Sequence, residues 1–549
     1  MSARRMCHSL LIVASAWWAL SNLARPADAA AVNADPSNYR TLLRTLNPGD
    51  SMRLEPGTYS QLRIVDLNGS SQAWITITGP SSGSPAIIAG EPGSNTVEIL
   101  NSSYVALENL RIDSRGIPSA FGISASGHEQ NLTHDIRIEG NALVGQNGGQ
   151  GTDAISTKTT TWGWIIRYNR ILGAGTGLYL GESDGTQPFV AGVIEHNLIQ
   201  DTIGYNMQIK DQVEFPAIPG LPTGPTSTII RNNVFIKNDQ PAIYYRPNLL
   251  VGSFPMTGAG SLNMYEIYGN YFFHNHREAL FQGSGRVTLH DNVFVDGPYA
   301  YPAVVLRKQN YPLQIAYVYN NTVYTSGRGI YFGTRAIVDD AVIGNLVFSL
   351  TPISGMIMRQ LNNLTDSLEN AARYVNAPSL NLGAMNFYPL PGKCQGAATD
   401  LSLFQTDEDY TLDFDGAPKT AAKKAVVFRG AYAGEGSNPS WKLQAGVKAP
   451  HPPALAPAPI LAWLSPATAQ TGSTVRLTLT GANFTPGATV AISGSGVRIG
   501  TVTVAGVTEI TATLTIAPNA ETGPRYVTVS GASTGSNPGK FQIQQRQAR

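Results

Sequence analysis

Apolar residues along most of the chain come in short groups, and asparagine separates many of these groups at regular positions. An aliphatic residue stands three positions before each of these asparagines, and apolar residues return directly after it. The pattern occurs at Asn141, Asn169, Asn197, Asn233, Asn270, Asn292, Asn321 and Asn345, with spacings of 22 to 37 residues. No amphipathic helix separates the repeats. A repeat of this length predicts a solenoid built from short strands and turns.

The fold class that fits is all-β, a right-handed parallel β-helix solenoid followed by an immunoglobulin-like β-sandwich. Coils of a β-helix stack in parallel register at about 4.8 Å. The repeated asparagine would form a ladder at a tight turn, with its side chain bonded to the next coil and its backbone in the left-handed region. A β-propeller also repeats, but its blades are longer and more regular.

A second set of segments, about ten residues after each asparagine, aligns as strands. These are 154–158, 177–181, 206–210, 242–246, 303–307 and 329–333, while 280–282 has an ambiguous register. Strand side chains alternate between two faces. The predicted inward positions are Ile155, Thr157, Leu178, Leu180, Met207, Ile209, Ile243, Tyr245, Val304, Leu306, Ile330 and Phe332. They are almost all apolar, which supports the register.

The outward positions of these strands form two columns. One column reads Ser156, Tyr179, Gln208, Tyr244, Val305 and Tyr331, and the other reads Lys158, Gly181, Lys210, Arg246, Arg307 and Gly333. Stacked cations repel one another, and an anionic polymer along the coils would offset that repulsion. We therefore expect an acidic polysaccharide as partner, bound by Tyr179, Gln208, Tyr244, Arg307 and Tyr331. The alternative is a set of strand-end residues that are only solvated.

The composition is compatible with this architecture. The chain has 549 residues, 14% of them charged, with 56 Gly and 35 Pro, which suits many short strands and more than one domain. We place the β-helix at 36–444, a Pro- and Ala-rich linker at 445–459 and a second domain at 460–545. The formal net charge of +1 excludes a global field that would attract nucleic acid. We expect a monomer.

The first 29 residues have the features of a secretion signal. Arg4 and Arg5 precede an apolar stretch at 10–20, and a small-x-small cleavage site ends at Ala29. A membrane anchor is the alternative, but the apolar stretch is short for a full span. We expect a secreted or periplasmic protein with no membrane insertion after cleavage. Cys394 is then the remaining cysteine, so no disulfide is expected.

Several motifs resemble those of known families. The run of segments 46–50, 54–59, 74–79 and 86–90 resembles the opening coils of secreted β-helix polysaccharide lyases of the pectate lyase-like superfamily, especially the chondroitinase B and alginate lyase family. Segments 386–390 and 430–441 resemble the closing part of such β-helices, so that the resemblance covers roughly 36–445. Segments 464–466, 472–475, 479–484 and 527–529 resemble the IPT/TIG immunoglobulin-like domains, which implies a spacer, docking or carbohydrate-contacting module.

The lyase resemblance implies site residues. The family places an acidic calcium ligand five residues before its catalytic lysine, which would make Asp153 a calcium ligand and Lys158 the base. The family's second acidic ligand falls on Gly151, and its catalytic arginine falls near Gly181. Glu182 and Asp184 are the substitutes for the missing calcium ligands. Lys210 and Arg246 are the substitutes for the missing cation.

The chemistry that suits such residues is β-elimination from a uronic acid polymer. A base removes the proton at C5, α to the carboxylate, and a cation or metal ion neutralises the developing charge. Lysine can be the base where neighbouring cations lower its pKa. The basic column provides such surroundings for Lys158 or Lys210.

Other candidates are an acid–base or metal site at His274, His276 and Arg277, and a groove wall at Glu214 in the insertion 212–226.

Three further functions compete with a lyase. A hydrolase needs two carboxyl groups facing one bond. The chain resembles the β-helix polygalacturonases only in the fragment Ile209-Lys210. Its Asp339-Asp340 pair lies outside the aligned strands. A C5 epimerase would use the same proton abstraction, but this chain lacks the Asp-Pro-His-Asp motif of such enzymes. A non-catalytic glycan-binding protein would use the same face.

Overall fold

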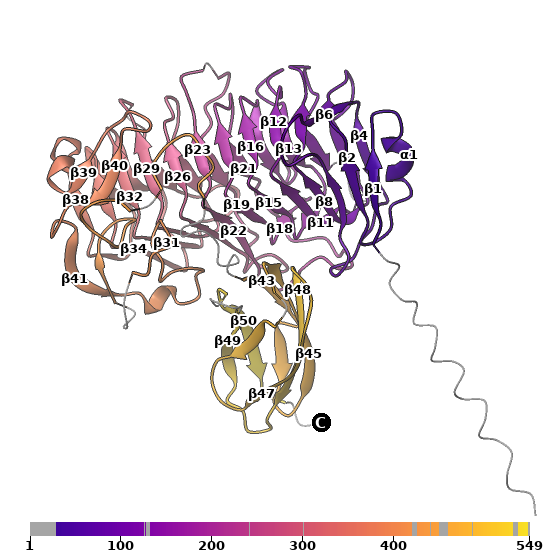
Figure 1. Ribbon diagram of the computed structural model, residues 1–549. Helices are drawn as coiled ribbons and strands as arrows, with labels where there is room; N and C mark the ends of the chain where they lie inside the picture. Colours follow the sequence, from indigo (N-terminus) through magenta and orange to yellow (C-terminus); the bar gives the residue numbers. More distant parts are fainter. Residues whose placement is uncertain are drawn as a thin grey trace, which may run out of the picture.

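The protein is an all-β molecule with two parts, a long stack of coils and a small sandwich below its middle (Figure 1). The computed structural model describes residues 29–125, 127, 132–240, 242–299, 301–419, 425–439, 441–449, 459–485, 487–530 and 536–546. The predicted signal segment falls almost wholly outside these residues, as does most of the predicted linker. No helix in the described part is long and apolar enough to cross a membrane.

Three long parallel sheets run the length of the stack, and each coil visits them in the order A, B, C. Sheet A contains β1 (Ala31–Ala34), β2 (Ser51–Leu54), β5 (Ile75–Thr78), β8 (Ser103–Glu108), β11 (His134–Glu139), β15 (Ile165–Arg167), β19 (Val193–Glu195), β22 (Ser227–Arg231), β25 (Met264–Tyr268), β28 (Arg286–His290), β31 (Ile315–Tyr319), β34 (Asp339–Ile343) and β37 (Gln360–Leu361). The predicted right-handed parallel β-helix is confirmed, and the propeller is excluded.

The other two sheets follow the same order along the stack. Sheet B contains β3 (Gly57–Tyr59), β6 (Ala86–Ala89), β9 (Arg111–Asp113), β12 (Ala142–Val144), β16 (Arg170–Leu172), β20 (Leu198–Gln200), β23 (Val234–Ile236), β26 (Tyr271–Phe273), β29 (Val293–Asp296), β32 (Thr322–Thr325), β35 (Leu346–Phe348) and β38 (Leu364–Asp366). Sheet C contains β4 (Leu62–Val65), β7 (Val97–Leu100), β10 (Ile123–Ala125), β13 (Asp153–Thr157), β17 (Thr176–Leu180), β21 (Met207–Ile209), β24 (Leu249–Val251), β27 (Phe281–Gly283), β30 (Val304–Leu306), β33 (Arg328–Phe332) and β36 (Thr351–Gly355). A short pair, β14 (Thr161–Trp162) and β18 (Phe189–Val190), lies between sheets C and A, and the helix α1 (Tyr39–Leu43) packs at the first coil.

The repeated asparagines form a continuous hydrogen-bonded ladder at the turn from sheet A to sheet B. At each step Oδ1 accepts from the backbone N–H and the Nδ2 of the ladder asparagine one coil earlier, as between Asn270 and Asn233 at 2.8 and 3.1 Å. One detail differs from the prediction, because the left-handed residue is the one just before the ladder position, such as Gly269 at φ 64°. That residue makes the turn and leaves the asparagine side chain facing inward.

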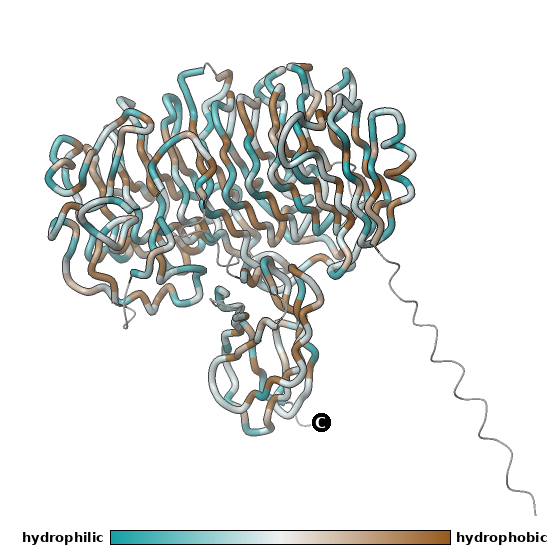
Figure 2. The backbone as a smooth tube through the Cα atoms, viewed as in Figure 1, coloured by the Kyte–Doolittle hydropathy of each residue, from teal (hydrophilic) through white to brown (hydrophobic). Residues whose placement is uncertain are grey.

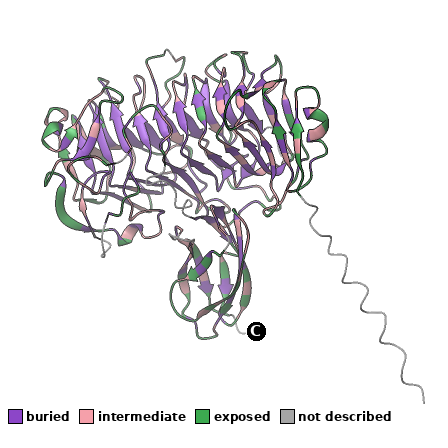
Figure 3. Ribbon diagram, in the orientation of Figure 1, coloured by how far each residue is buried: buried purple, intermediate pink, exposed green. Residues whose placement is uncertain are grey.

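The interior of the stack is filled by the inward side chains of all three sheets. Of the predicted inward positions, those on β13, β17, β21, β30 and β33 are fully or almost fully buried. Figure 2 shows apolar and polar residues alternating along the coils, and Figure 3 shows the strands of the stack as buried. Burial of these side chains stabilises the stack. Among the described residues, Cys394 is a free cysteine.

The predicted strand at 242–246 is wrong. Ile243 and Tyr245 are 78% and 52% exposed, and the strand of this coil is β24, whose Leu250 pairs with Gln208. Asn248 precedes β24 as Asn206 precedes β21, and both side chains are buried. Segment 242–246 is instead part of a long loop. Its Ile243 and Tyr244 N–H groups donate to the side chain of Gln150.

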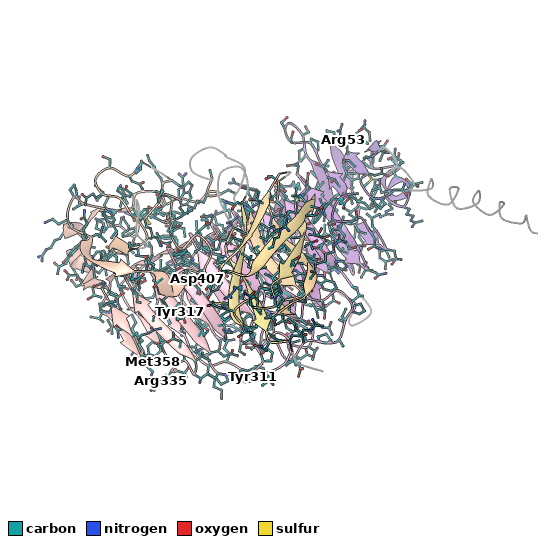
Figure 4. The ribbon with its side chains drawn as sticks, turned by 90° about the horizontal axis from the view of Figure 1, so that it is seen from below. Arg53, Tyr311, Tyr317, Arg335, Met358 and Asp407 are labelled. Atoms are coloured by element: carbon teal, nitrogen blue, oxygen red, sulfur yellow. The ribbon has the colours of Figure 1, made fainter. Side chains whose placement is uncertain are left out.

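The chain after the last coil folds back over sheets A and B. It contains η2 (Leu368–Arg373), β39 (Val375–Ala377), β40 (Asn386–Pro389), β41 (Gln395–Asp400), η3 (Ser402–Phe404) and β42 (Ala425–Phe428). Its apolar side chains join outward residues of sheet B in one cluster and of sheet A in another. Two buried ion pairs fix it to sheet A, Arg231 with Glu408 at 2.9 Å and Asp291 with Lys419. Figure 4 shows Asp407 of this segment near Tyr317 of β31.

The C-terminal part is a sandwich of two four-stranded sheets. Its strands are β43 (Ile460–Ser465), β44 (Thr468–Gln470), β45 (Thr474–Ala482), β46 (Thr489–Ile492), β47 (Val497–Gly506), β48 (Glu509–Ile516), β49 (Gly523–Ser530) and β50 (Gly539–Gln544). The predicted immunoglobulin-like sandwich is confirmed as a fold class, while the IPT/TIG assignment stays a prediction.

The sandwich is docked on sheet A. Ile460 and Ala482 pack against Ile165, Val193, Ile229 and Tyr268, and Arg167 donates to Asn483 at 3.1 Å. The insertion 212–226 takes part, because Phe215 and Leu221 pack with Ala462. Glu214 therefore belongs to a loop that contacts the sandwich, and a groove wall at this insertion stays a prediction.

Candidate functional site

Sheet C is the sheet on whose outer face neither the sandwich nor the returning chain packs an apolar cluster among the described residues. The sandwich and the returning chain pack on sheets A and B. By contrast, the apolar residues at outward positions of sheet C, Leu250 and Val305, belong to none of the apolar clusters formed by the described residues. Leu250 and Tyr179 are partly exposed on this face, while Val305 and Gln208 are buried. A ligand of this β-helix therefore has one long face available to it.

Two lysines from separate coils converge on one aromatic ring of this face. Tyr179 lies on β17, between β13 and β21. Lys158 directly follows β13 and places Nζ 4.9 Å from the centre of the Tyr179 ring, while Lys210 directly follows β21 and places Nζ 5.1 Å from it. Lys158 Nζ also lies 4.4 Å from the ring of Phe121. All four side chains are partly exposed, so the cations face solvent across aromatic surface.

Lys158 has a buried partner. Its Nζ lies 3.6 Å from Oδ2 of Asp153, whose side chain is 2% exposed. Burial raises the pKa of the Asp153 carboxyl to about 7, and the Lys158 ammonium offsets this only in part. Asp153 thus belongs to the site as the partner of Lys158. It is the first residue of β13 and Lys158 directly follows the last, so the two side chains meet along the length of the strand.

Lys210 has a different environment. Burial lowers the pKa of its ammonium group, Asp211 opposes this effect, and the nearby Arg246 lowers the pKa further. Arg246 reaches this position from the loop that follows β23, with its guanidinium carbon 5.2 Å from the centre of the Tyr205 ring and 5.1 Å from that of Tyr244. The site therefore contains the expected cation cluster, although Arg246 and Tyr244 come to it from a loop rather than from the strand column.

The remaining predicted residues are spread along the face. Gln208 on β21 pairs in register with Tyr179, and its buried Oε1 has no hydrogen-bond partner among the described residues. Arg307 follows β30 and donates to Gln282 at 3.3 Å. Tyr331, on the next strand, carries the Arg328 guanidinium over its ring. Arg307 is three strands beyond Lys210 in sheet C, about 14 Å at one coil spacing per strand.

The three carboxylates expected to bind calcium do not converge. Asp153 faces Lys158, Asp184 accepts from the backbone and the hydroxyl of Thr186 at 2.9 and 2.7 Å, and Glu182 accepts from the Ser183 N–H. Within the described part of the chain their oxygens do not form a common set of metal ligands. Calcium binding stays a prediction, without a set of ligands in this region.

Phe121 and Tyr205 belong to the site but were missed by the sequence analysis. Each lies in the loop between sheets B and C, just before a strand of sheet C, and these loops vary in length from coil to coil. These aromatic residues therefore do not recur at a regular spacing in the sequence. The available signal was an aromatic residue one to two positions before the start of an aligned strand.

Replacing Asp153 with asparagine is expected to remove part of the pH dependence of stability. The carboxyl loses its proton near 3.8 in the unfolded chain and near 7 in the folded protein, so the folded state binds more protons between these values. Its contribution to stability is therefore lost as pH rises through this window. Between about pH 5 and about pH 8 the wild type should lose on the order of 2 kcal/mol more unfolding free energy than the variant. Urea unfolding at both pH values measures the difference, and parallel losses would contradict the assignment.

No protein-family model matches the chain, and no curated protein matches it. Among solved structures, the family 6 alginate lyase AlyGC is similar over 66% of this chain at 14% identity, with a TM-score of 0.38. The chain spans about half of that protein, 55%. The periplasmic alginate epimerase AlgG is similar at 11% identity over 61% of this chain and 83% of its own, with a TM-score of 0.37. A mannuronic acid-specific family 6 lyase from human gut microbiota matches the same shares at 12% identity and a TM-score of 0.30. None of these similarities assigns a reaction to this chain.

Proposed function

We propose that this protein binds a uronic acid polysaccharide along the outer face of sheet C and cleaves it by β-elimination. The observation that carries the proposal is the pair of ammonium groups, Lys158 and Lys210, which come from the strands on either side of β17 and lie 4.9 and 5.1 Å from the centre of the Tyr179 ring. Two cations held about 10 Å apart by the intervening coil suit the carboxylates of a polymer that runs along the stack. The ring between them offers a stacking face for a sugar.

The two lysines differ in a way that suits a division of labour. The Lys158 ammonium, 3.6 Å from Asp153, can neutralise a substrate carboxylate and the negative charge that develops on it. Lys210 has a lowered pKa, with Arg246 as a second cation, so a larger share of it is neutral and able to accept a proton. We therefore assign the base to Lys210 and the electrostatic stabiliser to Lys158.

The proposed reaction then balances without a co-reactant. Neutral Lys210 takes the C5 proton, and the electron pair of that bond moves onto the carboxylate beside Lys158. The pair returns to form the double bond between C4 and C5, and the bond from C4 to the glycosidic oxygen breaks. The ammonium of Lys210 gives its proton to the leaving oxygen. The products are an unsaturated uronate end and a new hydroxyl end.

The place of action follows from the sequence. The basic and apolar start with its small-x-small site suits export, and we propose that the mature protein works in the periplasm or outside the cell. Polymeric acidic glycans are found in those compartments. The sandwich docks on sheet A, so it does not compete for the proposed binding face on sheet C.

A panel of acidic polysaccharides tests the proposal. Polyuronates and sulfated uronate polymers are incubated with the mature protein, with a neutral glucan as control. The ultraviolet absorbance of the new double bond and the retention of the protein on each polymer are both followed. We expect absorbance to rise on at least one uronate polymer, and binding to weaken as salt is added. Retention without any rise would establish a glycan-binding protein in place of an enzyme, and neither signal on any acidic polymer would overturn the proposal.

A further inference from the structure

A second cluster of side chains lies at the turn from sheet B to sheet C, apart from the Lys158–Tyr179–Lys210 site. Asp239 follows β23, and His274 and His276 follow β26, the neighbouring strand of sheet B. One ligand atom from each residue lies within 4.8 Å of the others. Nε2 of His274 is 2.9 Å from Oδ1 of Asp239, and Nδ1 of His276 is 3.8 Å from the same oxygen. In the described part of the chain this is the one group of three or more such residues that could hold a metal ion.

The histidine at the centre of the cluster is held by a second carboxylate. Nδ1 of His274 lies 3.5 Å from Oδ1 of Asp296, whose side chain is 0% exposed. The Asn275 and Gly297 N–H groups donate to the same oxygen, and the buried Oδ2 has no hydrogen-bond partner among the described residues. A carboxylate behind a ligating imidazole fixes the ring and leaves its other nitrogen free to bind metal. Asp296 thus gives His274 the orientation of a metal ligand, with Nε2 toward Asp239.

The ligand set selects a class of cation. Two imidazoles and one carboxylate suit zinc and similar transition metals, whereas calcium and magnesium prefer oxygen ligands. Bonds of about 2.0 Å in a tetrahedral site separate neighbouring ligand atoms by about 3.3 Å. The two separations from Asp239 bracket that value, so small side-chain adjustments would close the site. Water would supply the fourth ligand.

We propose that Asp239, His274 and His276 bind one zinc-class divalent cation, which links the loop after β23 to the loop after β26. The first of these loops carries Tyr244, Tyr245 and Arg246. Two hydrogen bonds already join it to the second loop, from Asn275 to the Arg246 carbonyl at 2.8 Å and from Arg277 to Tyr245 at 3.3 Å. Lys237, at the start of the first loop, donates to the same Arg246 carbonyl at 3.1 Å. The cation would add a fixed link at the exposed end of this contact and hold Arg246 against Tyr205. Metal binding itself does not depend on the proposed function.

Metal binding is measured on metal-free mature protein without a histidine tag. Zinc is titrated calorimetrically into the wild type, His276→Ala and His134→Ala. His134 is a matched control, because it also pairs with an aspartate, Asp135 at 2.7 Å, but belongs to no group of three ligands. We expect one site per chain in the wild type and in His134→Ala, and an affinity lower by about 100-fold or more in His276→Ala.

A second readout separates ligation from a folding defect. Zinc should raise the thermal unfolding midpoint of the wild type and of His134→Ala but not that of His276→Ala, since a ligand stabilises only a protein that binds it. Circular dichroism checks that His276→Ala is folded before titration. Equal zinc affinity in all three proteins, or no stoichiometric binding by the wild type, would overturn the proposal. Neither outcome bears on polysaccharide cleavage, which is assayed separately.

Discussion

Replacing Lys210 with alanine is expected to lower the rate of polysaccharide cleavage by about a thousandfold, because the reaction loses its general base. The stack should remain folded, since Lys210 is partly exposed and its strand β21 is paired through the backbone of Met207, Gln208 and Ile209. Binding of the polymer should weaken less than turnover, because Lys158 and Arg246 remain. Initial rates of absorbance increase at saturating polymer measure the loss.

Lys210→Arg is the decisive companion variant. Arginine keeps the positive charge but stays protonated, so it can bind a carboxylate and cannot act as the base. We expect this variant to retain binding and to lose turnover as severely as Lys210→Ala. Lys308→Ala is the control, because Lys308 is an exposed cation that follows Arg307 near the edge of the same face. Full turnover in Lys210→Arg would show that the side chain acts only through its charge.

Replacing Asn270 with alanine is expected to reduce the free energy of unfolding by on the order of 4 kcal/mol. Its Nδ2 donates to the Ile230 carbonyl, the Tyr268 carbonyl and Asn292 Oδ1 at 2.9 to 3.0 Å. Its Oδ1 accepts from the backbone N–H and the Nδ2 of Asn233. The residue is fully buried, so water cannot replace these partners. Urea unfolding of the variant and the wild type measures the loss.

Asn363→Ala provides a graded comparison. Asn363 occupies the last position of the ladder, is partly exposed, and donates to the Val342 carbonyl at 2.8 Å while accepting from Asn345. Its loss should cost clearly less than the loss of Asn270. Equal costs for the two variants, or a cost below about 1 kcal/mol for Asn270, would contradict a ladder in which burial and continuity determine the energy.

The sequence was most informative where the chain repeats. Each of these ladder asparagines has an aliphatic residue three positions before it, so the turn from sheet A to sheet B could be predicted at Asn141 or Asn321 alike. The inward positions of β13 and β21 followed from period-two alternation. What could not be read was the conformation of the turn itself, because Gly269, Asn232 and Tyr168 all take the left-handed role that was assigned to the asparagine after them.

The prediction was weakest in the loops between sheets B and C. Segment 242–246 has the composition of a strand, but Pro247 lacks an N–H, and Leu249 and Val251 provide the two inward apolar residues that this coil needs. A buried asparagine before the strand, Asn248, repeats the role of Asn206 and was the usable signal. Without that anchor, the loop length between β23 and β24 could not be fixed.

The candidate site was predicted in part. The lyase resemblance singled out Asp153 and Lys158, as a calcium ligand and a base, and the structure pairs them with each other. Lys158, Tyr179 and Lys210 come from aligned positions. Arg246 reaches the same region by a different route, since its loop folds back toward Tyr205. The docking of the sandwich on sheet A depends on residues far apart in sequence, such as Arg167 and Asn483. No local pattern encodes such a contact.

The most direct test of elimination at sheet C is proton NMR of the products formed from a uronate polymer that the protein retains. The proposed reaction predicts a vinylic proton signal from unsaturated uronate ends, growing in step with the number of new chain ends and absent with Lys210→Ala. New chain ends that are all saturated would mean hydrolysis. An unchanged polymer would mean that the face binds without cleaving, and either result would contradict the proposed elimination.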